Sequence, residues 1–182
     1  AKGLTRAEQA MAMYYQHGDV VRFARSYHPK DQPGIGKGEY LTVAGVAGEK
    51  GLVQLAKADG SFVVWAPERW GSNRIEVYAV QSRDIAKGDI LVWTRNDPSI
   101  GAVNGRTERI VDLDQRRGLV AIDRGRQGRI EIDLSKPQNR HWDHGYVQTA
   151  HAAQGRTADR VMLHAESFRA NVINQRSFYV AL

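Results

Sequence analysis

The segments Gly18-Asp19-Val20-Val21-Arg22-Phe23 and Gly88-Asp89-Ile90-Leu91-Val92-Trp93 follow one pattern, a Gly-Asp pair directly before a short apolar run. Glycine and aspartate favour turns, and the β-branched and aromatic residues after them favour strands. The two segments lie about 70 residues apart, which indicates a weak internal repeat of that length. The pattern therefore predicts two copies of one β unit, each beginning at its Gly-Asp pair.

Residues 19–134 consist of short strand-like runs separated by turn signals. The turns are expected at Asp59-Gly60, Lys87-Gly88-Asp89, Asn104-Gly105 and Arg117-Gly118. The strands are expected at residues 20–25, 40–46, 52–56, 62–65, 75–80, 90–95, 107–113, 119–122 and 129–134. So many short and evenly spaced strands are typical of small barrels and not of an α/β sheet. We expect two consecutive small β-barrels, at residues 18–86 and 87–142.

The two ends of the chain differ from this middle part. Thr5 and Glu8 have the spacing of a capping box, and apolar residues follow at helical intervals. This predicts an N-terminal helix within residues 1–17. Residues 143–182 read as strand, short helix, strand and final helix, the closing part of an α/β domain. The pattern stops midway in a motif, so we expect a piece of a larger protein.

The composition favours a polyanionic partner. The net charge is +6, and arginine supplies 19 of the 26 cationic residues. Arginine is densest in residues 106–129, where Arg116, Arg117, Arg124 and Arg126 form a candidate DNA-binding or protein-recruitment patch. A solvated basic face is the alternative. The chain has no cysteine, which excludes disulfides and thiolate metal sites and fits a reducing compartment. It also has no apolar run long enough to span a membrane.

The stretch Tyr146-Val147-Gln148-Thr149-Ala150-His151-Ala152-Ala153-Gln154-Gly155-Arg156 carries the most chemistry. A strand that ends in a turn with Thr149 and His151 presents a hydroxyl, an imidazole and free backbone N–H groups to a phosphate. Gln154 can orient a phosphate or a water molecule, and Gly155 permits a close backbone approach. The alternative is structural, with Thr149 as a helix cap and Gly155 as a helix end.

This stretch resembles motif V of superfamily-one helicases of the RecD-like branch, and residues 177–182 resemble the start of their motif VI. Residues 93–97, followed by Asn104-Gly105, resemble the segment before a barrel inserted in the second motor domain. The ordered set is similar to conjugative relaxase-helicases of the F-factor type (the MobF family). Ala150 departs from that pattern, in which valine is usual.

The resemblance implies a mainly β chain with an α/β C-terminal part, in which tandem SH3-like barrels are inserted in a partial RecA-like motor domain. It implies that Thr149 and His151 contact single-stranded DNA, and that Gln154 and Gly155 line the nucleotide cleft of the parent protein. The parent would be an ATP-dependent DNA helicase with a DNA-nicking relaxase domain, cytoplasmic in the donor cell and itself transferred to the recipient. A type IV secretion coupling protein and the rest of the helicase chain would be partners.

No phosphate-binding loop of the form Gly-x-x-x-x-Gly-Lys-Ser/Thr occurs in the sequence. We therefore expect no catalysis and no cofactor in this fragment, with ATP and Mg²⁺ held elsewhere in the parent. The alternative is a degenerate helicase-like remnant that acts only as a structural or protein-interaction module.

Two further sets of residues are candidates for DNA contact. Arg95 and Asn96 join a guanidinium and an amide at a strand end, a combination that suits a backbone phosphate or a base edge. The alternative is a turn built by Asn96-Asp97-Pro98. The aromatic residues Trp65, Trp70, Trp93 and Tyr78 are either stacking surfaces for bases or core and rim residues of the barrels.

Overall fold

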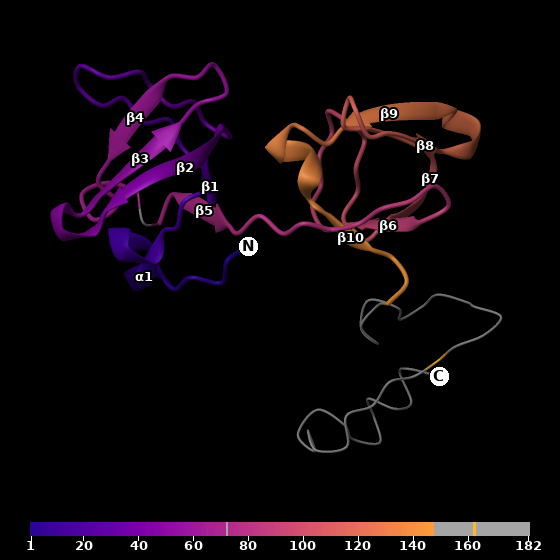
Figure 1. Cartoon of the computed structure of the whole chain (residues 1–182), viewed down its shortest axis with the longest axis horizontal. Coiled ribbons are helices and arrows are strands. Elements are labelled where there is room, and N and C mark those ends of the chain that lie inside the picture. The colour runs from indigo at the N-terminus through magenta and orange to yellow at the C-terminus, as the bar shows by residue number, and fades with distance from the viewer. Residues whose placement is uncertain (72, 148–161, 163–182) are drawn as a thin grey trace. The chain divides into compact units, whose positions relative to one another are not determined.

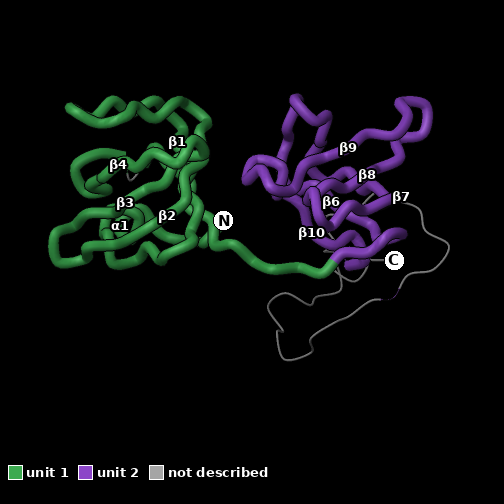
Figure 2. Tube along the Cα trace, turned by 45° about the horizontal axis from the view of Figure 1, so that its top comes forward, with its two compact units in different colours: residues 1–84 green, residues 85–182 purple. Residues whose placement is uncertain are grey.

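The computed structural model describes residues 1–71, 73–147 and 162 of the 182-residue chain. The chain divides into two compact units, Ala1–Asp84 (unit 1) and Ile85–Leu182 (unit 2) (Figure 2). The described residues of each unit form one antiparallel β-sheet, and the described helices are short. The prediction of a mainly β chain is therefore confirmed for the described residues.

Unit 1 contains five strands in the spatial order β4-β3-β2-β1-β5 (Figure 1). The strands are β1 (Val20–Phe23), β2 (Tyr40–Ala47), β3 (Leu52–Ala56), β4 (Phe62–Trp65) and β5 (Ile75–Tyr78). A 3-10 helix, η2 (Gly48–Lys50), connects β2 to β3. All neighbouring strands are antiparallel, and alternate residues of each strand face the core.

The described residues of unit 2 form five strands in the order β10-β6-β7-β8-β9. They are β6 (Ile90–Trp93), β7 (Thr107–Asp114), β8 (Leu119–Asp123), β9 (Arg129–Asp133) and β10 (Trp142–His144). Two 3-10 helices, η3 (Gly125–Gln127) and η4 (Pro137–Arg140), lie on either side of β9 in the chain. The pairings are again antiparallel throughout.

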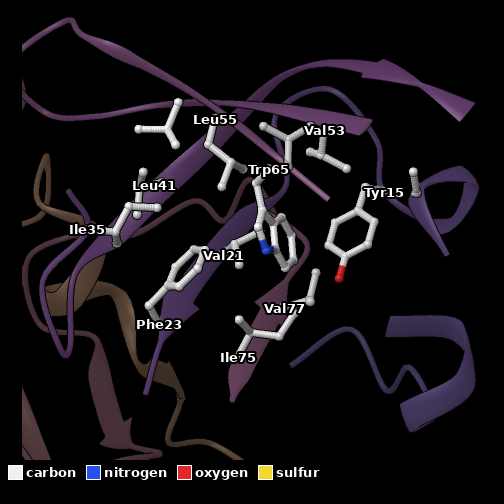
Figure 3. Packing of buried hydrophobic residues seen from close by; sticks show 13 residues of the cluster. Tyr15, Val21, Phe23, Ile35, Leu41, Val53, Leu55, Trp65, Ile75 and Val77 are labelled. Carbon is white, nitrogen blue, oxygen red and sulfur yellow. The ribbon is translucent and has the colours of Figure 1, made fainter. Parts of the chain in front are cut away.

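The prediction of closed barrels is wrong, because both sheets are open. Within the described residues, β4 and β5 are the edges of one sheet, and β9 and β10 are the edges of the other. In unit 1 the core is completed by residues outside the sheet, with Tyr15 and Ile35 packed against the strand residues Phe23 and Trp65 (Figure 3). In unit 1, edge strands of four residues and these covering segments take the place of closure.

The predicted repeat is present in the structure. Both sheets have the same strand order when β1 to β5 are matched with β6 to β10. Both also have a register shift at the same point of the second strand, between Val43 and Gly45 in one unit and between Ile110 and Asp112 in the other. The second to fifth strands correspond at an offset of 67 residues, whereas β1 and β6 differ by 70. Unit 1 therefore has a longer loop after its first strand.

The Gly-Asp pairs have the same role in both units. Gly18 and Gly88 have φ angles of 87° and 98°, a region that favours glycine. Their N–H groups donate to the carbonyls of Val43 and Ile110, at 2.9 and 2.8 Å. The following carboxylate closes the turn, because Asp19 and Asp89 each accept a backbone N–H from three residues earlier, both at 2.8 Å. The motif therefore sets where the first strand of each sheet begins.

A cationic clamp fastens the first loop of each unit. The residue directly after the third strand, Lys57 or Arg124, reaches back to that loop and to a carboxylate at the start of the second strand. Lys57 Nζ donates to the carbonyl of Gly34 at 2.5 Å and pairs with Glu39 at 3.1 Å. In each copy the cation holds the long loop onto the sheet.

The clamp of unit 2 is the more deeply buried of the two. Arg124 donates to the carbonyl of Ile100 at 2.7 Å and to both carboxylate oxygens of Glu108, at 2.6 and 3.1 Å. Trp93 Nε1 also donates to Glu108 at 2.7 Å. The side chains of Arg124 and Glu108 are 6% and 2% exposed. Gly101 leaves room for the clamp, since an added Cβ would lie 2.6 Å from the Arg124 guanidinium.

The N-terminal segment contains less helix than the sequence pattern predicts. The capping box between Thr5 and Glu8 is present, but α1 covers only Arg6–Ala10 and is followed by the 3-10 helix η1 (Ala12–Tyr14). The physical reason is Tyr15, which is buried edge-on against Trp65 and donates its hydroxyl to the carbonyl of Gln9 at 2.6 Å. Burial, and then Asp19, raise the pKa of this hydroxyl well above its usual value.

Most of the predicted closing α/β part, residues 143–182, lies outside the described residues. Its first residues are described, and they belong to the second sheet. β10 pairs with β6, with Trp142 opposite Trp93 and His144 opposite Leu91. None of the helices in the described part of the chain has the length and apolar character needed to cross a bilayer.

The clamp of unit 2 generates the first prediction. Arg124→Ala leaves the Glu108 carboxylate buried without its main partner, so we expect unit 2 to lose about 3 kcal/mol of stability. Urea unfolding followed by tryptophan fluorescence measures this loss, with Trp93 and Trp142 as the reporters in unit 2. Arg126→Ala is the matched control, because Arg126 is exposed in η3 and its change should cost less than about 0.5 kcal/mol. Equal unfolding midpoints for the two variants would show that the clamp does not stabilise the unit.

Candidate nucleic-acid interface

Two loops of unit 1 bring a tyrosine, a tryptophan and an arginine together, and we call this group the aromatic shelf (Tyr27, Trp70 and Arg74). The ring centroids of Tyr27 and Trp70 are 4.4 Å apart, with an angle of 33° between the ring planes. The Arg74 guanidinium carbon lies 5.6 Å from the Trp70 ring centroid. All three residues are half-buried, so each keeps part of its surface in contact with solvent.

Hydrogen bonds and packing fix the position of the shelf. Tyr27 pairs with Ile35 through two backbone bonds, of 2.9 and 2.7 Å, which close the loop between β1 and β2. The indole N–H of the buried Trp65 donates to the carbonyl of Trp70 at 2.8 Å. Phe23 lies beneath both shelf rings, stacked at 6.3 Å from Tyr27 and 5.7 Å from Trp70. Contacts with the core residues Phe23 and Trp65 therefore hold the shelf in place.

The chemistry of the shelf suits an unpaired base next to a phosphate. Half-exposed aromatic rings offer a stacking surface for any base, and an arginine beside them adds cation–π attraction and phosphate contact. The same two loops also carry the exposed residues Arg25 and Arg69. Trp70 is among the aromatic candidates that the sequence pattern indicates, whereas Tyr27 and Arg74 are not. Only the tertiary structure joins them, because they come from separate loops.

The other aromatic candidates have structural roles. Trp65 and Trp93 are buried in the cores of unit 1 and unit 2. Tyr78 lies on the opposite face of the first sheet, where its hydroxyl donates to Glu76 at 2.5 Å. Glu76 also pairs with Arg22 at 3.2 Å, so this face is a network of neutralised charges and not a basic surface.

The predicted contact residues Arg95 and Asn96 lie in the first loop of unit 2, at the positions that correspond to Arg25 and Ser26 in unit 1. Asn96 is exposed, and its side-chain oxygen accepts the backbone N–H of Asn104 at 2.8 Å. Arg95 is half-buried. Asn96 thus helps to build the loop, while its exposure keeps it accessible to a ligand.

Unit 2 has no counterpart of the shelf among its described residues. Asp97 stands at the position of Tyr27, as the matching backbone bridges Tyr27–Ile35 and Asp97–Ala102 show. Pro137 and His141 stand at the positions of Trp70 and Arg74, at the offset that relates the fourth and fifth strands. The carbonyls of Arg74 and His141 accept equivalent bonds, from Ala24 and Thr94. The two copies have therefore diverged at the surface that would receive a ligand.

The four arginines of the predicted patch differ in exposure, since three are exposed and one has a buried side chain. Arg116 and Arg117 are exposed in the turn between β7 and β8, and Arg126 is exposed in η3. Arg124 is the buried clamp residue and is not available at the surface. Sequence density alone did not distinguish it from its neighbours. Nearby, the Arg129 side chain bonds to Asp112 at 2.8 Å and lowers the pKa of that carboxyl.

The predicted motif residues Thr149, His151, Gln154 and Gly155 lie outside the described residues. Among the residues that are described, no three histidine, aspartate or glutamate side chains come together in a geometry suited to a metal ion. Within the described residues, the candidate binding surfaces are therefore the shelf of unit 1 and, separately, the exposed arginines of unit 2.

Comparison with known proteins finds relatives among conjugal transfer proteins. No family model matches the sequence. A probable conjugal transfer protein TraA of Sinorhizobium fredii is 35% identical over 80 residues, 44% of this chain and 7% of the relative. Conjugal transfer protein TraA of Agrobacterium fabrum is 34% identical over 74 residues, 41% of this chain and 7% of the relative.

The multifunctional conjugation protein TraI of Escherichia coli is 24% identical over 167 residues. That match spans 91% of this chain, and so covers at least part of both units, but only 9% of the relative. The matched segments thus cover less than a tenth of the length of each of these relatives. Its sequence is related to those of the conjugative transfer proteins TraA and TraI.

Proposed function

We propose that this chain is part of a conjugative relaxase-helicase and that it binds single-stranded DNA through the aromatic shelf of unit 1. The observation that carries the proposal is the pairing of Tyr27 with Trp70 at 4.4 Å, with the Arg74 guanidinium over the Trp70 ring. The similarity to conjugation proteins supplies the context in which a single strand is the natural ligand.

Single-stranded DNA fits the shelf better than duplex DNA does. Bases in a duplex are stacked on each other, so their faces are not free to contact an aromatic side chain. A single strand offers free faces, and each stacked base contributes roughly 1–3 kcal/mol. The net charge of +6 and the exposed arginines favour the phosphate backbone without selecting a sequence. We expect weak binding that tolerates many sequences and falls as salt rises.

The proposal extends to the arrangement of the parent protein. The two units would be SH3-like insertions in the second, RecA-like motor domain. Thr149 and His151 would contact the DNA track, and Gln154 and Gly155 would line the nucleotide cleft, with ATP and Mg²⁺ held elsewhere in the parent. The work of this chain would then be to guide the strand and not to hydrolyse ATP. A helicase-like remnant with a purely structural role is the competing proposal, and it requires no DNA binding by the shelf.

Variants of the shelf provide the test. We expect the full chain to bind a labelled single-stranded oligonucleotide with a dissociation constant of about 10⁻⁴ to 10⁻⁶ M. Trp70→Ala and Tyr27→Ala should each weaken this binding by roughly 5- to 100-fold, because each removes a stacking surface. Fluorescence anisotropy at several salt concentrations measures both the affinity and its salt dependence.

Two controls separate stacking from folding. Trp70→Phe keeps an aromatic ring over Phe23 and should retain most of the affinity. Tyr14→Ala removes a tyrosine that is also partly exposed in unit 1 but belongs to η1, so it should leave affinity unchanged. If Trp70→Ala binds as the wild type does, or if no strand binds at low salt, the shelf is not a DNA site and the structural remnant is favoured.

We also propose that the exposed arginines of unit 2 contribute to recruitment by a type IV secretion coupling protein. This role rests on the exposure of Arg116 and Arg117 in the turn between β7 and β8 and of Arg126 in η3, whereas Arg124 is buried in the clamp. Polar, exposed turns on a rigid sheet are common places for binding residues.

Charge reversal tests the recruitment role without damaging the clamp. The triple variant Arg116→Glu, Arg117→Glu and Arg126→Glu in the parent protein should lower transfer into recipient cells and leave the fold intact, at under about 0.5 kcal/mol per change. A reporter that follows transfer of the protein without DNA separates the two possible partners. If protein transfer stays at the wild-type level while DNA affinity falls, these arginines serve DNA binding alone.

A further inference from the structure

The outer edge of β4 in unit 1 is occupied by a side chain. The Val64 N–H donates to Gln32 Oε1 at 2.6 Å, and Gln32 Nε2 donates to the Val64 carbonyl at 3.3 Å. One amide thus bonds both backbone groups of a single edge residue. In an antiparallel sheet a residue of the next strand would make this same pair of bonds. Gln32 therefore occupies the place that an additional strand would take.

The chain positions Gln32 with a segment that unit 2 lacks. Between the backbone bridges, unit 1 has residues 28–34 and unit 2 has residues 98–101, so the loop of unit 1 is three residues longer. This longer part contains Gln32 and Asp31, which has a φ angle of 58°, a conformation that aspartate tolerates better than most residues. The clamp from Lys57 to the carbonyl of Gly34 holds the end of the same segment.

The outward side chains also differ between β4 and the corresponding edge strand of unit 2, β9. On β4 they are Phe62 and Val64, which are 51% and 42% exposed. The corresponding strand of unit 2, β9, carries Arg129 and Glu131 at these positions. Charged residues on an edge strand oppose the addition of another strand, whereas an exposed apolar edge invites it. Unit 2 is protected by charge, and unit 1 has an apolar edge with the longer loop folded over it.

We propose that the edge of β4 is a strand-addition surface that Gln32 blocks, and that the strand it excludes is β4 of a second copy of this chain. Residues 62–65 carry no charge, so no charge repulsion between these residues opposes pairing with an identical strand. A two-fold antiparallel pairing centred on Val63 sets Phe62 of one copy opposite Val64 of the other, an aromatic and β-branched pair that favours sheet formation. The second copy would take both hydrogen bonds that Gln32 makes.

Sedimentation velocity of the full chain over a range of concentrations tests this surface. We expect the wild type to remain a monomer of 20.3 kDa. Gln32→Ala should form dimers, with an affinity at least about tenfold tighter than any self-association of the wild type. Gln32→Asn should dimerise as well, because its shorter side chain does not reach β4. Gln127→Ala, which removes an exposed glutamine from η3 of unit 2, should remain monomeric.

A second substitution shows whether the dimer uses β4. Adding Val64→Glu to Gln32→Ala copies the charged residue of unit 2 and should restore the monomer. Amide hydrogen exchange at Val64 gives a readout that does not require the dimer: Gln32 protects this amide in the wild type, and diluted, monomeric Gln32→Ala should expose it. The proposal is overturned if Gln32→Ala is monomeric at every concentration, if Val64→Glu leaves its dimer intact, or if the wild type dimerises equally well. None of these outcomes depends on DNA binding.

Discussion

The clamp between the end of the third strand and the long first loop is the interaction on which the arrangement of each unit depends. An open sheet of five short strands leaves one side of its core uncovered, and the first loop helps to cover it. Lys57 and Arg124 hold that loop because each side chain binds both a loop carbonyl and a carboxylate. In unit 1 the clamped loop supplies Ile35 to the core, Tyr27 to the aromatic shelf and Gln32 to the edge of β4. One ion pair therefore supports packing, candidate binding and edge protection together.

The two units share a scaffold but present different surfaces. Strand order, register shift, Gly-Asp turn and clamp are common to both, whereas the shelf and the apolar edge occur in unit 1 alone among the described residues. Such divergence is expected when one copy of a repeat keeps a surface and the other is free to change. The physical constraints on the scaffold are burial and hydrogen bonding, and neither restricts the residues at the loop tips.

The similarity to TraA and TraI proteins suggests which kinds of partner these surfaces would bind. In our proposal the parent protein meets single-stranded DNA, motor domains and secretion components, and the two small β units offer surfaces for such partners. The chemistry of the shelf suits an unpaired base, and the exposed arginines of unit 2 suit an acidic partner. In our proposal the sheets contribute rigidity and the loops contribute recognition, with hydrolysis of ATP left to other parts of the parent protein.

The sequence by itself determined the β character, the repeat, the Gly-Asp turns and the capping box at Thr5, because each depends on backbone preferences of nearby residues. It also indicated the relation to conjugation proteins through the order of its motifs. Only the tertiary structure decided that the sheets are open, that Arg124 is a buried clamp and not a surface arginine, and that Tyr27, Trp70 and Arg74 meet. Each of these depends on contacts between residues distant in the chain. Such contacts are set by packing and by the pairing of buried charges, and they leave no periodic signal in the sequence.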